Sequence, residues 1–144
     1  MAVATEPLTE AEVRLFVYEW YEGLSNKDPL PVVRARVAAD TLEMRFPDTI
    51  LRSVADFESW YGSVTHQFFN QVHIIESCEV SLDGITADLK VRVRWETDIW
   101  KPPAARSHRE AYRAGQTWRV ARGPASAPVI TYYSIDTMEP VAPD

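Results

Sequence analysis

Two side chains in this sequence are candidates for proton transfer, Glu76 and His108. Glu76 lies between Ile74 and Cys78 in an alternating segment whose even positions are otherwise apolar, so we expect its carboxylate to face the interior. Burial raises a carboxyl pKa, and a carboxyl group that titrates near neutral pH suits general acid or base catalysis. The alternative is a glutamate that pairs with an arginine, or a β-bulge that turns it outward.

His108 is the second candidate because it shares its strand parity with Glu110 and Tyr112. An imidazole beside a carboxylate can move protons near neutral pH, and we place the three side chains at the mouth of an interior cavity. The alternative is a half-exposed histidine near a loop. We expect His66 to be solvated and His73 to face outward. The three histidines lack the spacing of a zinc site, so we expect no metal.

The aromatic content, with five Trp, six Tyr and five Phe, is high for a chain of this length. Such side chains form either a packed core or the wall of an apolar pocket, and both interpretations stay open. A glutamine among them could hold a substrate oxygen where negative charge develops. The candidate substrate-binding residues are Trp20, Phe46, Trp60, Trp95, Tyr112, Gln116 and Trp118.

In the first half of the chain, the sequence predicts mainly helices, and these would position the candidate residues found there. Thr9 and Glu12 form a capping box ahead of an apolar stripe that continues to Leu24. Asp28 is expected to cap a short helix over residues 30–38, and Ser53 a third helix with its apolar stripe from residue 57 to 68. Between the last two, residues 42–46 alternate as a short strand.

The second half alternates with the period of strands, over residues 72–82, 85–100, 107–121 and 129–138. A two-residue turn at Asp83-Gly84 would bring Glu76 opposite Val91. A connection centred on Pro103 would bring Val91 opposite Gln116 and Trp95 opposite Tyr112. The inward face of the last strand stays undecided. This order of elements predicts an α+β fold, with three N-terminal helices packed on a strongly curved, mostly antiparallel sheet.

Composition narrows the class of protein. The 144 residues fit a single domain, 1–144, whose ordered core we place at about residues 9–138. The net charge of −6 argues against nucleic acid as a partner. No apolar run is long enough for a membrane span, and the first nine residues lack a signal-peptide pattern, so we expect a cytoplasmic protein. No dinucleotide or phosphate-binding glycine motif occurs, and we expect no cofactor.

Several short sequence segments fit this order of elements. They are residues 20–28 at the end of the first helix, residues 38–42 at the entry to the first strand, the helix with Trp60 and Tyr61, and His73-Ile74-Ile75 at the start of the meander. In these features the chain resembles the nuclear transport factor 2-like superfamily, which includes ketosteroid isomerase and the SnoaL-like polyketide cyclases. The resemblance implies a cone-shaped barrel, an apolar ligand between helices and sheet, and a homodimer.

The resemblance to ketosteroid isomerases is incomplete at the positions that carry their chemistry. Their first-helix tyrosine falls near Trp20 and Tyr21, and their late-strand acid falls near Gln116, which cannot ionise. Their aspartate base falls near residues 44–46, where no carboxylate faces inward. The Asp-Arg-Asp arrangement of limonene-epoxide hydrolases is also missing.

These observations predict a small-molecule enzyme of the cyclase, isomerase or dehydratase type. It would bind a planar apolar substrate in the cone, with Glu76 or His108 moving a proton and Gln116 or Tyr112 holding an oxygen. One alternative is a non-catalytic binder of an apolar metabolite. Another is an assembly subunit with the same fold, such as the β chain of ring-hydroxylating dioxygenases, for which a filled cone is expected.

Overall fold

The first helix packs one apolar face into the core, with Val13, Phe16, Val17, Trp20 and Tyr21 buried. The computed structural model describes residues 6–144, and in it α1 spans Glu10–Asn26. Thr9 and Glu12 form the expected capping box, and Lys27 ends the helix in the left-handed conformation. Residues 1–5, part of the segment expected to be loose, lie outside the described residues.

The second helix is shorter than the expected 30–38, because α2 spans only Leu30–Arg34. The expected cap at Asp28 is wrong: Pro29 is the N-cap and no side chain caps this helix. The chain leaves the helix early because its backbone pairs with the last strand, where Ile130 N donates to Arg36 O at 2.9 Å and Ala38 N donates to Ile130 O at 2.8 Å. α3 spans Val54–Gln67, and the side chain of Ser53 caps it as expected.

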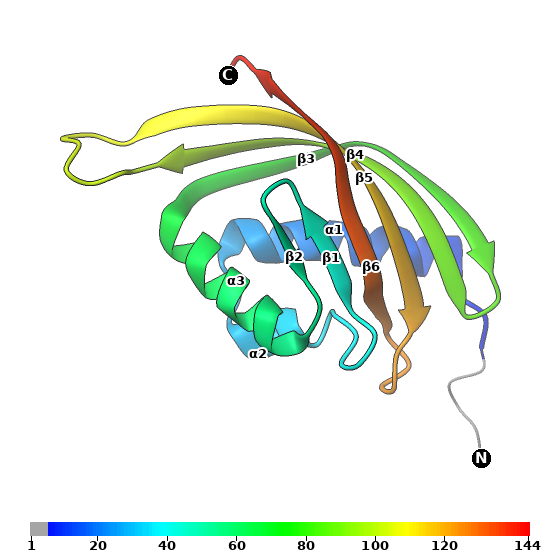
Figure 1. Cartoon of the computed structure of the whole chain (residues 1–144). Coiled ribbons are helices and arrows are strands. Elements are labelled where there is room, and N and C mark those ends of the chain that lie inside the picture. Colours follow the sequence, from blue (N-terminus) through cyan, green and yellow to red (C-terminus); the bar gives the residue numbers. More distant parts are fainter. Residues whose placement is uncertain (1–5) are drawn as a thin grey trace.

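Six strands form one sheet in the order β2-β1-β6-β5-β4-β3, and the two end strands do not pair, so the sheet curves without closing. The short hairpin is β1 (Glu43–Phe46) and β2 (Thr49–Leu51), of which β2 was not expected. The long strands are β3 (Phe68–Asp83), β4 (Thr86–Ile99), β5 (His108–Arg122) and β6 (Pro128–Val141). Figure 1 shows the long strands arching over α1. The helix α3 and the β1–β2 hairpin lie under the same arch, beside α1.

The pairing of β3 with β4 differs from the expected register. Asp83 pairs with Thr86, so β3 is displaced by two residues along β4 relative to the expected register. Val91 therefore lies opposite Cys78 instead of Glu76. Further along β3, register shifts occur between Phe69 and Val72 and between Ile75 and Ser77. Each bulge inserts a residue and exchanges the inward and outward positions of the strand beyond it.

The register between β4 and β5 is confirmed. Trp95 lies opposite Tyr112, and Val91 lies opposite Gln116. The inward face of β6, undecided from the sequence, is also settled. Ile130 and Tyr133 are both buried because β6 itself has an extra residue, Thr131, opposite the step from Arg119 to Val120 of β5.

The core lies between α1 and the concave face of the long strands. The largest side chains with almost no exposed surface are Trp20, Phe57, Met44 and Trp118. The convex face carries ion pairs between strands. Arg109–Asp98 and Arg119–Asp88 link β5 to its neighbour β4, and Arg113–Glu76 reaches across β4 from β5 to β3.

Candidate active site

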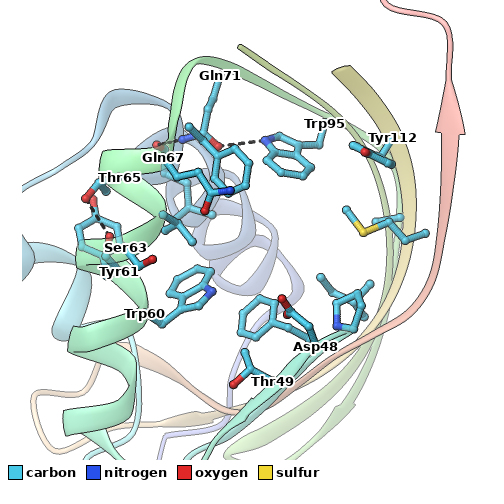
Figure 2. Close-up of a pocket in the computed structure, with 18 of the residues that line it drawn as sticks. Asp48, Thr49, Trp60, Tyr61, Ser63, Thr65, Gln67, Gln71, Trp95 and Tyr112 are labelled. Carbon is cyan, nitrogen blue, oxygen red and sulfur yellow. Dashed lines mark hydrogen bonds between the residues drawn. The ribbon is translucent and has the colours of Figure 1, made fainter. Parts of the chain in front are cut away.

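A cavity of about 870 Å³ opens between α3, the β1–β2 hairpin and the concave face of the sheet. Its size is within the range of small-molecule sites, which is about 300–1,000 Å³. Figure 2 shows Trp60 on α3 and Trp95 and Tyr112 on the sheet facing this space, with Asp48 and Thr49 at its lower edge. The expected residues Phe46, Trp60, Trp95, Tyr112 and Gln116 all line it.

Two of the expected wall residues do not line the cavity. Trp20 and Trp118 are fully buried behind it, and their rings meet edge to face with centroids 6.1 Å apart. The prediction that they contact substrate is therefore wrong, because the core between α1 and the sheet encloses both rings. Tyr133, which packs against both indoles, lines the cavity wall in their place.

His73 lines the cavity, so the expectation that it faces outward is wrong. The bulge between Ile75 and Ser77 exchanges the faces of β3, and His73 lies on the inward side beyond it. Its Nδ1 is 2.8 Å from the Ser25 hydroxyl at the end of α1. Its ring stacks on Tyr21, with centroids 5.1 Å apart, and lies parallel to Trp95 on the other side.

Burial sets the charge of this imidazole. The surroundings of His73 lower its pKa from the ordinary 6.5 to about 3, because the charged form would lose its hydration. The ring is therefore neutral at physiological pH, with one nitrogen able to accept a proton and the other able to donate one. Ser25 occupies Nδ1, and Nε2 has no hydrogen-bond partner within residues 6–144.

A second polar group lies beside His73 at the inner end of the cavity. Gln116 Oε1 accepts hydrogen bonds from the Tyr21 hydroxyl at 2.5 Å and from Trp118 Nε1 at 2.8 Å. These two bonds fix the amide and leave its NH₂ group as a donor, and the Tyr133 hydroxyl lies close to both the Tyr21 hydroxyl and Gln116. Burial raises the pKa of Tyr21 and of Tyr133, so both phenols stay protonated.

At the opposite end, three side chains of β5 form a chain of hydrogen bonds. His108 Nε2 lies 2.5 Å from Glu110 Oε2, and the Tyr112 hydroxyl donates to Glu110 Oε1 at 2.5 Å. Glu110 and Tyr112 line the cavity, but His108 does not, and half of its side chain is exposed (51%). These residues come together as the sequence predicted, with His108 on the solvent side.

Glu76 lies on the opposite face of the sheet. The expected inward orientation is wrong, because the bulge that begins at this residue turns its side chain to the convex face. There Arg113 donates two hydrogen bonds to its carboxylate, at 2.7 and 3.0 Å. The guanidinium lowers the pKa of Glu76, which is the reverse of the shift that a general acid near neutral pH requires.

Four residues of the inner end were not among the expected site residues: Tyr21, Ser25, His73 and Tyr133. Tyr21 is part of the apolar stripe of α1, which marks it as buried but not as cavity-lining. Ser25 has no motif around it. A histidine that interrupts an apolar strand was the available signal for His73, and strict alternation concealed it.

Residues 6–144 contain no group of three or more His, Cys, Asp or Glu side chains placed to hold a metal ion. Within the same residues, each helix is too short or too polar to cross a bilayer.

No protein-family model matches the chain, and no curated protein matches it. Solved structures do. A proposed dehydratase of the NTF2-like family from Streptomyces avermitilis superposes with a TM-score of 0.70 at 13% identity, covering 92% of this chain and 96% of that one. The chain has the nuclear transport factor 2-like (NTF2-like) fold.

Two further structures share this NTF2-like architecture. A ketosteroid isomerase-like protein from Erwinia carotovora atroseptica has a TM-score of 0.70 at 16% identity, covering 94% of this chain and 100% of its own. A type 2 hexachlorocyclohexane dehydrochlorinase has a TM-score of 0.75 at 9% identity, covering 93% of this chain and 89% of its own. At these identities the likeness establishes the fold alone, and the chemistry has to be argued from the residues of the site.

Proposed function

We propose that this NTF2-like protein is a small-molecule enzyme that isomerises or dehydrates a planar, largely apolar carbonyl compound. The observation that carries the proposal is the position of His73. A neutral imidazole with an open Nε2 lines a cavity of enzyme size, beside fixed hydrogen-bond donors. Several solved neighbours are named as an isomerase-like protein, dehydratases and a dehydrochlorinase, which supports this class of reaction.

In the proposed reaction His73 carries its hydrogen on Nδ1, which donates to the Ser25 hydroxyl, and Nε2 takes a proton from the carbon next to the carbonyl. The electron pair of that C–H bond moves to the carbonyl oxygen, which the Gln116 NH₂ group and the Tyr133 hydroxyl hold as it becomes negative. Return of the proton to a different carbon completes an isomerisation. In a dehydration, the proton instead leaves with a hydroxyl group from the neighbouring carbon, as water.

The low pKa of His73 limits the range of substrates. An imidazole of pKa about 3 is a weak base, so the carbon acid must itself be activated. A C–H bond next to a carbonyl meets this requirement once the oxygen is bound. The aromatic wall, with Phe46 stacked on Trp60 at 4.7 Å between centroids, favours a planar ring system over a flexible chain.

Hydrogen exchange at carbon tests the proposal without the natural substrate. β-Tetralone is a ketone fused to a flat benzene ring, its acidic α-hydrogens exchange with D₂O, and NMR follows that exchange. We expect the protein to accelerate it above the buffer rate and His73→Gln to abolish the acceleration. His66→Gln, at an exposed position of α3, is the matched control and should retain it.

Two results would contradict the proposal. Saturable binding of the ketone without faster exchange would favour the non-catalytic binder, and the absence of binding would remove the small-molecule site. The open cavity already counts against the assembly subunit, for which a filled cone was expected. The homodimer remains a prediction, for which light scattering on a sizing column is the direct measurement.

A further inference from the structure

The end of the cavity that lies away from Gln116 contains a carboxylate beside aromatic side chains, and Lys101 lines the cavity near it. Glu110 lines the cavity on the inward face of β5, next to Tyr112, and its side chain is 30% exposed. The Tyr112 hydroxyl and the His108 ring hold one carboxylate oxygen each. The carboxylate is thus fixed in orientation, and the same hydrogen bonds lower its pKa and keep it ionised.

A row of rings connects this end to the inner end. Tyr21 stacks on His73, His73 is parallel to Trp95, and Trp95 stacks on Tyr112, with successive centroids 5.1, 6.3 and 5.8 Å apart. Tyr21 is hydrogen-bonded to Gln116 at one end of the row, and Tyr112 is hydrogen-bonded to Glu110 at the other. The wall therefore has a polar group at each end and aromatic surface between them.

We propose that Glu110 is a second ligand subsite, which binds the hydroxyl or amino group of a fused-ring ligand that lies along this row of rings. An ionised carboxylate accepts hydrogen bonds and offers none, and each of its oxygens can accept more than one. It therefore selects a ligand group that carries a hydrogen, and discriminates against an ether at the same place. The subsite rests on the proposed small-molecule pocket and adds to it the identity of a second functional group.

Paired probes of one shape test this subsite. 2,6-Dihydroxynaphthalene carries a hydroxyl at each end, and 2,6-dimethoxynaphthalene has ether oxygens in the same places. We would measure the dissociation constants of both by titration calorimetry, with wild type, Glu110→Gln, and Glu79→Gln as a control on the exposed side of β3. Thermal unfolding of each variant checks that the fold is intact, and Glu110→Ala replaces Glu110→Gln if that variant does not fold.

We expect wild type and Glu79→Gln to bind the diol at least tenfold more tightly than the diether, as the loss of a hydrogen bond to a charged group implies. Glu110→Gln should reduce this preference about tenfold. An unchanged preference in Glu110→Gln would overturn the subsite and leave the pocket intact. If wild type bound neither probe, the pocket itself would be refuted and the subsite with it.

Discussion

The hydroxyl of Ser25, at the end of α1, lies 2.8 Å from Nδ1 of His73 on β3. A hydroxyl can donate or accept, so this contact stabilises either tautomer of the neutral ring. It supplies no negative charge to stabilise the protonated ring. Ser25 is therefore one reason why burial dominates the pKa of His73.

Replacing Ser25 with aspartate should raise the pKa of His73. A carboxylate within hydrogen-bond distance favours the imidazolium and offsets part of the cost of burial. Proton–carbon NMR of the ring across a pH titration measures the change directly. Ser25→Ala should leave the ring neutral above pH 5, and Ser81→Asp, at an exposed position of β3 outside the cavity, is a charge-matched control. An unchanged His73 titration in Ser25→Asp would show that the two side chains are not in contact in solution.

His73 should also make the protein less stable in acid. Its folded pKa of about 3 lies below the ordinary 6.5, so the unfolded chain binds a proton more readily between these values and unfolding becomes easier as pH falls. In His73→Gln this contribution is missing. Between pH 7 and pH 5 the free energy of unfolding of wild type should therefore fall by about 1–2 kcal/mol more than that of the variant, as measured by urea unfolding. Parallel stability curves for the two proteins would contradict the low pKa.

Glu76→Gln should leave the chemistry of the cavity unchanged. Its carboxylate bonds to Arg113 on the convex face, and Glu76 contributes no atom to the cavity wall. The exchange rate of β-tetralone in the variant should therefore equal that of wild type. The ion pair is at the surface, so the melting temperature should change little. Loss of exchange in a folded Glu76→Gln protein would return this residue to the mechanism.

Trp20→Ala and Trp60→Ala should have opposite consequences for stability and binding. Trp20 is 0% exposed and packs against Phe57, Trp118 and Tyr133, so its removal leaves a void that should cost about 3–5 kcal/mol. Trp60 borders an existing cavity, so its loss should destabilise the fold less. It should, however, weaken probe binding more. Urea unfolding and calorimetric titration of the two variants would settle the comparison, and equal losses of stability would contradict it.

Much of the fold follows from periodicity and turn signals alone. The capping box of α1, the Ser53 cap and the pairing of Trp95 with Tyr112 all result from local rules. The shorter α2 does not, because its end depends on pairing with Ile130, which is distant in the sequence.

The candidate site was predicted less well, and the reason is physical. His108, Glu110 and Tyr112 lie on an uninterrupted stretch of β5, where alternation holds. Glu76 and His73 lie at and beyond a bulge in β3, where it fails. A bulge forms where the curvature of the whole sheet requires one, and no residue type in this stretch announces it.

The bulge in β3 means that the chemistry of this cavity depends on the register of one strand as well as on residue type. Loss of the bulge at constant chain length would restore strict alternation, present Glu76 to the interior and turn His73 to the outer face. A carboxylate and an imidazole would thus exchange places without any substitution at either position. In a lineage built on this scaffold, a change of sheet curvature that removes one bulge is a route from one acid–base group to another.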